Sequence, residues 1–177
     1  MTRYHPLLVA LHWLMALMIL MALAAGGLFL ANMPADSPDK VQGLGGHMAF
    51  GMAIGVLLVI RLATRLASQK PPHAATGNGV LDRLGRWTHW AFYVLIAGMV
   101  LTGLAMAFGA GLFEIVYGGA AQTLPPELAD LPQRAAHGVI ATALVALIAL
   151  HLVAAIYHQL VLKDRLLGRM WFGKRQP

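Results

Sequence analysis

Four long apolar runs limit the folds that are open to this chain. They cover about residues 7–33, 44–66, 87–108 and 133–162. Each reaches the roughly 20 residues that a helix needs to cross the hydrocarbon core of a bilayer. Because hydrocarbon offers no partner to backbone polar groups, an isolated spanning run has to be helical. The sequence therefore predicts an all-α integral membrane four-helix bundle, with residues 1–177 as one domain.

The composition agrees with this prediction. The chain is 59% hydrophobic and 11% charged, whereas a soluble domain is nearer half apolar and a quarter charged. It contains no cysteine. Disulfides, iron–sulfur clusters, zinc–thiolate sites and thiol catalysis are therefore excluded.

The basic residues lie almost entirely on one side of the predicted membrane. Eleven of the 13 flank the second connection or the two ends of the chain. They are Arg3, Arg61, Arg65, Lys70, Arg83, Arg86, Lys163, Arg165, Arg169, Lys174 and Arg175. Only Lys40 and Arg134 lie on the other side, with most of the acidic residues. The positive-inside rule therefore predicts cytoplasmic termini and basic contacts with membrane lipid, not with nucleic acid.

A secretory signal peptide is an alternative interpretation of the first run. Arg3, an apolar core and "ALA" at residues 22–24 resemble such a peptide with its cleavage site. However, the run continues to about residue 31, and cleavage would leave three spans whose loop charges no longer match the termini. We therefore interpret the first run as a membrane span.

Six of the eight histidines lie within or at the edge of the apolar runs. They are His12, His47, His89, His137, His151 and His158, whereas His5 and His73 fall outside and are expected to be solvated. An imidazole without a partner in hydrocarbon costs free energy, so such residues are functional candidates. At 1.5 Å per residue they form two layers. His47 and His137 lie toward the periplasm, and His12 and His151, with His89 as a third candidate, lie toward the cytoplasm.

The spacing on the fourth run indicates two stacked sites. His137 and His151 are fourteen residues apart, which is almost four helical turns, so both side chains share one face about 21 Å apart along the axis. Zinc would need three or four close ligands, and no carboxylate lies within the four runs to complete a set. Two neutral imidazoles from facing helices instead suit six-coordinate haem iron in a bundle core.

The second run has two related features. Gly51 and Gly55 share a stripe with His47 and would let a flat macrocycle approach the backbone, although such stripes also serve ordinary helix packing. Arg61 lies fourteen residues after His47, on nearly the same face and near the depth of His151. We interpret it as a partner for a haem propionate. Snorkelling to the interface is the alternative.

The chain resembles the bacterial cytochrome b561 family, which comprises small four-span di-haem cytochromes. The matching motifs run in order along nearly the whole chain. They are "LHW" at 11–13, "GGHMAFG" at 45–51, "VIRLATRL" at 59–66, "THWAFYVLIAGMVLTG" at 88–103, "AAHGVIA" at 135–141 and "LHLVAAIYHQLVLKD" at 150–164. Each motif is weak alone, but the ordered set is specific.

This resemblance implies two non-covalent haem b groups. Carried onto this chain, the family's ligands are His12 with His151 for the cytoplasmic-side iron and His47 with His137 for the periplasmic-side iron. His89 also matches a family histidine, one not usually counted as a ligand. It is the rival for the cytoplasmic layer.

The resemblance also implies an activity. Such a protein is a multi-pass oxidoreductase of the bacterial inner membrane that transfers single electrons between a periplasmic-side donor and a quinone such as ubiquinone. One kind resembles a superoxide oxidase, a superoxide:quinone oxidoreductase. His158 could then serve a propionate, a quinone or a proton path, or be an interfacial polar residue.

Two further functions stay open at this point. The chain could be a haem b subunit that passes electrons to or from a partner dehydrogenase or reductase. Alternatively, a proton or metal transporter would use the same histidines as a relay. Such a transporter should carry acidic residues within its spans, and the four runs have none.

Overall fold

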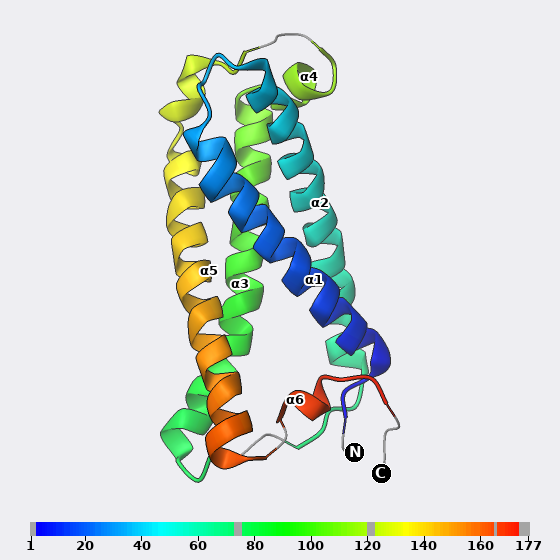
Figure 1. The fold of residues 1–177 in the computed structure, drawn as a ribbon. Helices are drawn as coiled ribbons and strands as arrows, with labels where there is room; N and C mark the ends of the chain where they lie inside the picture. Colours follow the sequence, from blue (N-terminus) through cyan, green and yellow to red (C-terminus); the bar gives the residue numbers. More distant parts are fainter. Residues whose placement is uncertain (1–2, 73–75, 120–122, 165, 174–177) are drawn as a thin grey trace.

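The computed structural model describes residues 3–72, 76–119, 123–164 and 166–173. Its four long helices form a bundle in which the first helix runs obliquely across the other three (Figure 1). They are α1 (Pro6–Ala24), α2 (Pro38–Ala67), α3 (Gly79–Gly109) and α5 (Pro132–Tyr157). Short π- or 3-10 helical segments extend two of them, η1 (Ala25–Phe29) and η2 (Leu30–Asn32) after α1, and η4 (His158–Leu162) after α5. The remaining elements are α4 (Leu112–Val116), η3 (Pro126–Ala129) and α6 (Leu166–Arg169). His73, Arg165, Lys174 and Arg175 lie outside the described residues.

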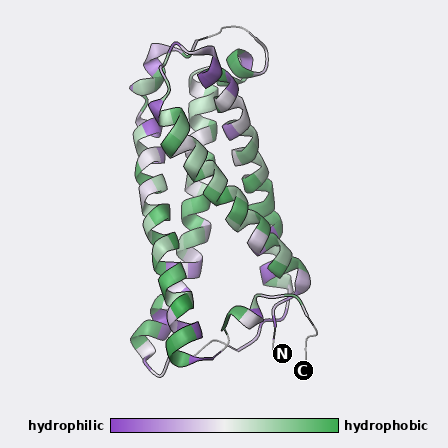
Figure 2. Cartoon of the chain, in the orientation of Figure 1, coloured by the Kyte–Doolittle hydropathy of each residue, from purple (hydrophilic) through white to green (hydrophobic). Residues whose placement is uncertain are grey.

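The all-α prediction and the four spans are confirmed. Within the residues that the structure describes, four continuous helical stretches are long and apolar enough to cross a membrane. They are Pro6–Asn32, Pro38–Ala67, Gly79–Gly109 and Pro132–Leu162. Their middle parts are apolar, and polar residues gather toward both ends of the bundle (Figure 2). Large side chains such as Val59 and Val139 are about 70% exposed, as expected where lipid replaces water around the bundle.

Two helices begin earlier than their apolar runs. α2 begins at Pro38 and α3 at Gly79, whereas the runs begin near residues 44 and 87. Hydropathy marks where a helix meets hydrocarbon, but capping chemistry decides where it begins. Pro38 occupies the first turn of α2, and the Asn78 side chain accepts hydrogen bonds from the backbone N–H groups of Val80 and Leu81.

An apolar core separates the two predicted histidine layers. Each of the four long helices contributes to it, through Met15, Ile54, Leu58, Ile96 and Leu144. Leu144 is 2% exposed and lies midway along α5 between His137 and His151. Apolar side chains from all four helices therefore meet at mid-depth, between the two histidine layers.

The C-terminal segment, which includes α6, packs against one end of the bundle (Figure 1). Both termini and the connection between α2 and α3 lie there (Figure 1). The Trp13 indole donates to the Met170 carbonyl at 2.8 Å, and the Tyr4 N–H donates to the Arg169 carbonyl at 3.1 Å. The Arg169 guanidinium donates in turn to the Pro72 carbonyl at 2.7 Å. The two chain ends and the α2–α3 connection are thus tied together.

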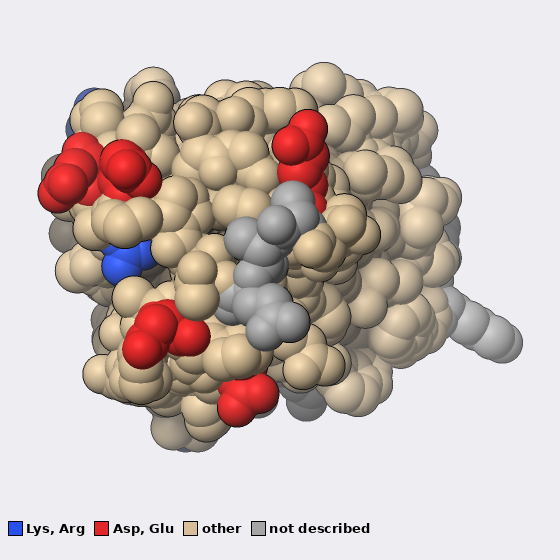
Figure 3. All heavy atoms as spheres, turned by 90° about the horizontal axis from the view of Figure 1, so that it is seen from above, with Lys and Arg blue, Asp and Glu red and all other residues tan. Residues whose placement is uncertain are grey.

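The opposite end carries most of the acidic side chains. Figure 3 shows acidic groups spread over this face around a basic one. The acidic residues at this end are Asp36, Asp39, Glu114, Glu127 and Asp130. One end is therefore basic and the other acidic, as the positive-inside rule requires if the termini are cytoplasmic.

The predicted orientation can be tested with single cysteines, because the natural chain has none. Asp36 and Lys70 are both exposed and lie at opposite ends. In intact spheroplasts, a membrane-impermeant maleimide should label Asp36→Cys, and it should label Lys70→Cys only after permeabilisation. The reverse pattern would show that the termini face the periplasm.

Candidate functional site

His47 and His137 form the first of two imidazole pairs, which we call the outer pair. His47 projects from α2 and His137 from α5, near the acidic end of the bundle. Their ring centroids are 6.3 Å apart and their planes are inclined at 71°. The two histidines of the predicted periplasmic layer are therefore brought into an edge-to-face contact.

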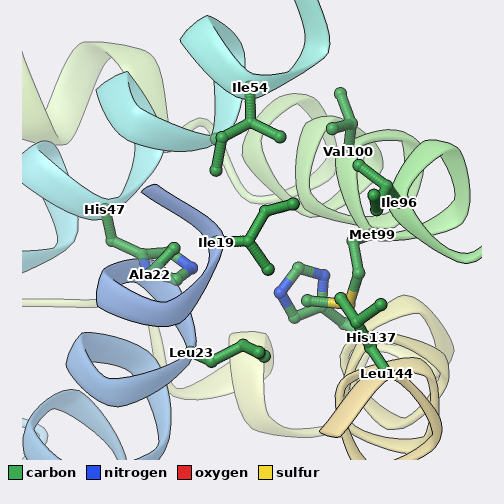
Figure 4. Close-up of a pocket in the computed structure, with 11 residues that line it drawn as sticks. Ile19, Ala22, Leu23, His47, Ile54, Ile96, Met99, Val100, His137 and Leu144 are labelled. Carbon is green, nitrogen blue, oxygen red and sulfur yellow. The ribbon is translucent and has the colours of Figure 1, made fainter. Parts of the chain in front are cut away.

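An apolar cavity of about 60 Å³ adjoins the outer pair. Side chains from all four long helices line it, with Ile19, Ala22 and Leu23 from α1 and Ile96, Met99 and Val100 from α3. In Figure 4, the Ile19 and Leu23 side chains point toward the space that the two imidazoles approach from α2 and α5. Apart from these imidazoles the cavity has an apolar lining.

The nitrogens of the outer pair differ in their hydrogen bonding. His137 Nδ1 lies 2.9 Å from Thr102 Oγ1. The same hydroxyl lies 2.7 Å from the Gly98 carbonyl, to which it donates. His47 Nδ1 is buried and has no hydrogen-bond partner among the described residues. One imidazole of the pair is thus oriented by a neighbour, whereas the other carries an unsatisfied nitrogen.

The second pair, which we call the inner pair, consists of His12 on α1 and His151 on α5. Its ring centroids are 6.4 Å apart and its planes are inclined at 74°. These values lie within 0.1 Å and 3° of those of the outer pair. Two pairs with almost the same geometry at two depths indicate two sites of the same kind.

His89 is also part of the inner layer. Its ring centroid lies 5.9 Å from that of His151, with the planes at 87°. His89 Nδ1–H donates to the Gly85 carbonyl at 2.7 Å, within its own helix. The distance and angle between the His89 and His151 rings differ from the values that the outer and inner pairs share. Both His12 and His89 nevertheless lie within ring contact of His151.

Two guanidinium groups lie beside the inner layer. Arg61 donates to the Leu8 carbonyl at 2.9 Å and lies 3.4 Å from His12 Nδ1. Arg65 lies over the Tyr93 ring, 5.9 Å from its centroid. Among the described residues neither guanidinium forms an ion pair with a carboxylate. The inner pair is therefore bordered by positive charge that an anionic group could neutralise.

Sequence reasoning missed two contacts. Thr102 was not singled out, although a hydroxyl within a span and near the depth of His137 is a usable signal. The second contact joins His158 Nδ1 to Asp164 Oδ2 at 2.6 Å. It forms because the chain leaves α5 through the π-helical η4, which begins at His158, and then turns at Lys163, where φ is 54°. His158 is thus paired with a carboxylate at the end of the bundle, away from both imidazole pairs.

The imidazole pairs fit haem better than a bare metal ion. Two imidazoles that share one metal at bonds of about 2.0 Å have ring centres roughly 6 Å apart, as both pairs do. A haem iron needs only these two axial ligands from the protein. Within the described ranges no group of three or more His, Asp or Glu side chains is arranged to hold a metal ion. The fold and its imidazole pairs define a class, the membrane cytochromes of b type.

The comparisons with known proteins agree with this class. The chain belongs to the prokaryotic cytochrome b561 family, whose sequence model matches residues 3–173. It is 29% identical over 178 residues to "Probable superoxide oxidase CybB" of Yersinia pestis, covering 98% of each chain. It is 28% identical over 170 residues to "Cytochrome b562" of Cereibacter sphaeroides, covering 94% of each. The resemblance seen in the sequence is confirmed, and membership implies haem b binding and electron transport by a multi-pass membrane protein.

Gly26 provides a test of the outer site. A Cβ atom at Gly26 would lie 3.1 Å from His47 Cε1, whereas one at the adjacent Gly27 would meet nothing within 4 Å. Leucine at position 26 should therefore displace the His47 ring, and Gly26→Leu should lose about half of its b-type absorbance per chain. The matched variant Gly27→Leu should keep all of it. Full absorbance in both variants would mean that haem binding does not need His47 in this position.

Proposed function

We propose that this protein is a di-haem b electron carrier of the bacterial inner membrane. It transfers single electrons between a donor at the periplasmic end and a quinone in the lipid. The observation that supports this proposal is the matched geometry of the outer and inner pairs, with centroid separations of 6.3 and 6.4 Å. Since His137 and His151 lie about 21 Å apart along one helix, the two sites would form a relay across the membrane.

The proposed ligands follow from the pairs. His47 and His137 would hold the periplasmic-side haem, and His12 and His151 the cytoplasmic-side haem. Bound haem with both axial positions filled supplies one-electron oxidation and reduction without substrate binding at the iron. The apolar core around Leu144 excludes water between the sites. His89 would support the inner site without being an axial ligand.

In this proposal Arg61 also affects which nitrogen of His12 carries the hydrogen. A guanidinium can only donate hydrogen bonds, so its contact with His12 Nδ1 leaves the His12 hydrogen on Nε2. Ligation by His12 requires the opposite tautomer. A propionate would draw Arg61 away, and the Leu8 carbonyl that Arg61 now occupies would be free to accept from His12 Nδ1–H. His89 already donates to a carbonyl four residues before it in the same way.

The superoxide oxidase name of one relative suggests the substrates. Two superoxide anions would each give up one electron and leave as dioxygen, and a quinone would take up two electrons and two protons to become a quinol. The acidic end does not favour long-range attraction of an anion. Lys40 and Arg134, on the first turns of the helices that carry His47 and His137, would supply local positive charge.

The acidic end also favours a second candidate function. Its five carboxylates would attract a basic protein surface, as electrostatic complementarity between redox partners requires. In that case the chain would be a haem b subunit that exchanges electrons with a partner dehydrogenase or reductase. The inner site and its quinone would keep the same role.

The ligand assignment can be tested by counting haem. His47→Ala and His137→Ala should each lose one of two haems per chain and keep the other, and so should His12→Ala and His151→Ala. His89→Ala should retain two. The measurement is pyridine haemochrome absorbance against protein concentration. Loss of a haem in His89→Ala with retention in His12→Ala would exchange these two residues in the assignment.

The activity can be tested by stopped-flow spectroscopy of the purified protein. Superoxide should reduce the b-type bands within the mixing experiment, and a soluble ubiquinone analogue should then reoxidise them. Superoxide dismutase provides the control, since it should abolish the reduction. A folded protein without haem would contradict the whole proposal. Haem that reacts with a quinone but not with superoxide would contradict the superoxide step and favour a protein partner.

A further inference from the structure

The hydroxyl of Thr102 makes a specific contact with the outer pair. Thr102 lies on α3, and its Oγ1 is 2.9 Å from His137 Nδ1 on α5. It is also 2.7 Å from the Gly98 carbonyl and 3.1 Å from the Met99 carbonyl. The group is partly buried, so water does not compete freely for these contacts.

These contacts determine which nitrogen of His137 carries the hydrogen. A threonine hydroxyl has one hydrogen, and a backbone carbonyl can only accept. That hydrogen is therefore directed to the Gly98 or Met99 carbonyl, and Oγ1 accepts from His137 Nδ1–H. The lone pair of His137 is consequently on Nε2, where a metal ligand needs it. Donation to a carbonyl also strengthens the hydroxyl oxygen as an acceptor.

The Met99 carbonyl also accepts a hydrogen bond from His137, so it supports the same tautomer as Thr102. His47 Nδ1 is buried without a hydrogen-bond partner. At the inner pair, the group that contacts His12 Nδ1 is the donor Arg61. Thr102 thus accepts a hydrogen bond from its histidine, whereas Arg61 donates one to His12.

We infer that Thr102 is a positioning residue that orients His137 as an axial ligand and lowers the reduction potential of the outer haem. This inference rests on the proposed function. An imidazole that donates its second N–H to an acceptor is a more basic ligand, and a more basic ligand stabilises ferric over ferrous iron. Hydrogen bonding of this kind is one of the means by which a protein sets haem potential.

The test is a potentiometric titration of purified protein that carries both haems. The wave of the outer haem is identified as the one that His47→Ala lacks. Thr102→Val removes the hydroxyl but keeps the branched shape, so it should move this wave to a more positive potential and leave the other wave in place. Thr102→Ser keeps the hydroxyl and should restore the wild-type value.

Thr142 offers a matched control on α5. Its hydroxyl donates to the Gly138 carbonyl at 3.0 Å and is exposed, so Thr142→Val loses a comparable helix contact without touching a histidine. This variant should leave both waves unchanged. Should Thr102→Val fail to accumulate, Thr102→Ala removes the same hydrogen bond and should give the same positive shift.

Two outcomes would overturn the inference. In the first, both haem potentials of Thr102→Val and Thr102→Ala match those of the wild type. In the second, both potentials shift equally, as a general destabilisation of the bundle would cause. A wild-type protein with two haems and an unresponsive Thr102 rejects this inference alone. A wild-type protein that lacks two waves rejects the di-haem proposal on which the inference rests.

Discussion

The structure depends on the inability of hydrocarbon to solvate a polar group. Backbone polar groups at that depth have to be satisfied within the helix, and an imidazole there needs a partner of its own. Within the described part of the chain, the four histidines of the outer and inner pairs meet across the bundle rather than pointing to lipid. These four imidazoles are thus gathered into two places, one on either side of the apolar core.

Much of this arrangement could be predicted from the sequence. The lengths of the apolar runs predict four helices, and a rise of 1.5 Å per residue is enough to place six histidines by depth. The spacing of His137 and His151 even predicts a shared face on one helix. All of these features are local, because they depend only on the geometry of a single helix.

The remaining features depend on how helices are rotated against one another. Depth alone could not separate His12 from His89 as the partner of His151, because both lie in the inner layer. The contact of Thr102 with His137 joins α3 to α5, and no pattern within either span specifies it. The pairing of His158 with Asp164 requires the chain to leave α5 through a π-helical turn and fold back. The helix starts at Pro38 and Gly79 follow capping chemistry, which hydropathy does not detect.

The two pairs have different neighbouring groups, and this difference would favour electron transfer in one direction through the bundle. The pairs have nearly the same geometry, so on geometry alone electrons would pass as easily one way as the other. The neighbouring groups differ, because an electron-donating contact through Thr102 borders the outer pair and the positive charge of Arg61 borders the inner pair. Positive charge favours an added electron, and a more basic ligand disfavours it. With haem in both sites, these neighbours would place the reduction potential of the outer haem below that of the inner haem, so that an electron passing from the acidic end to the basic end would move downhill.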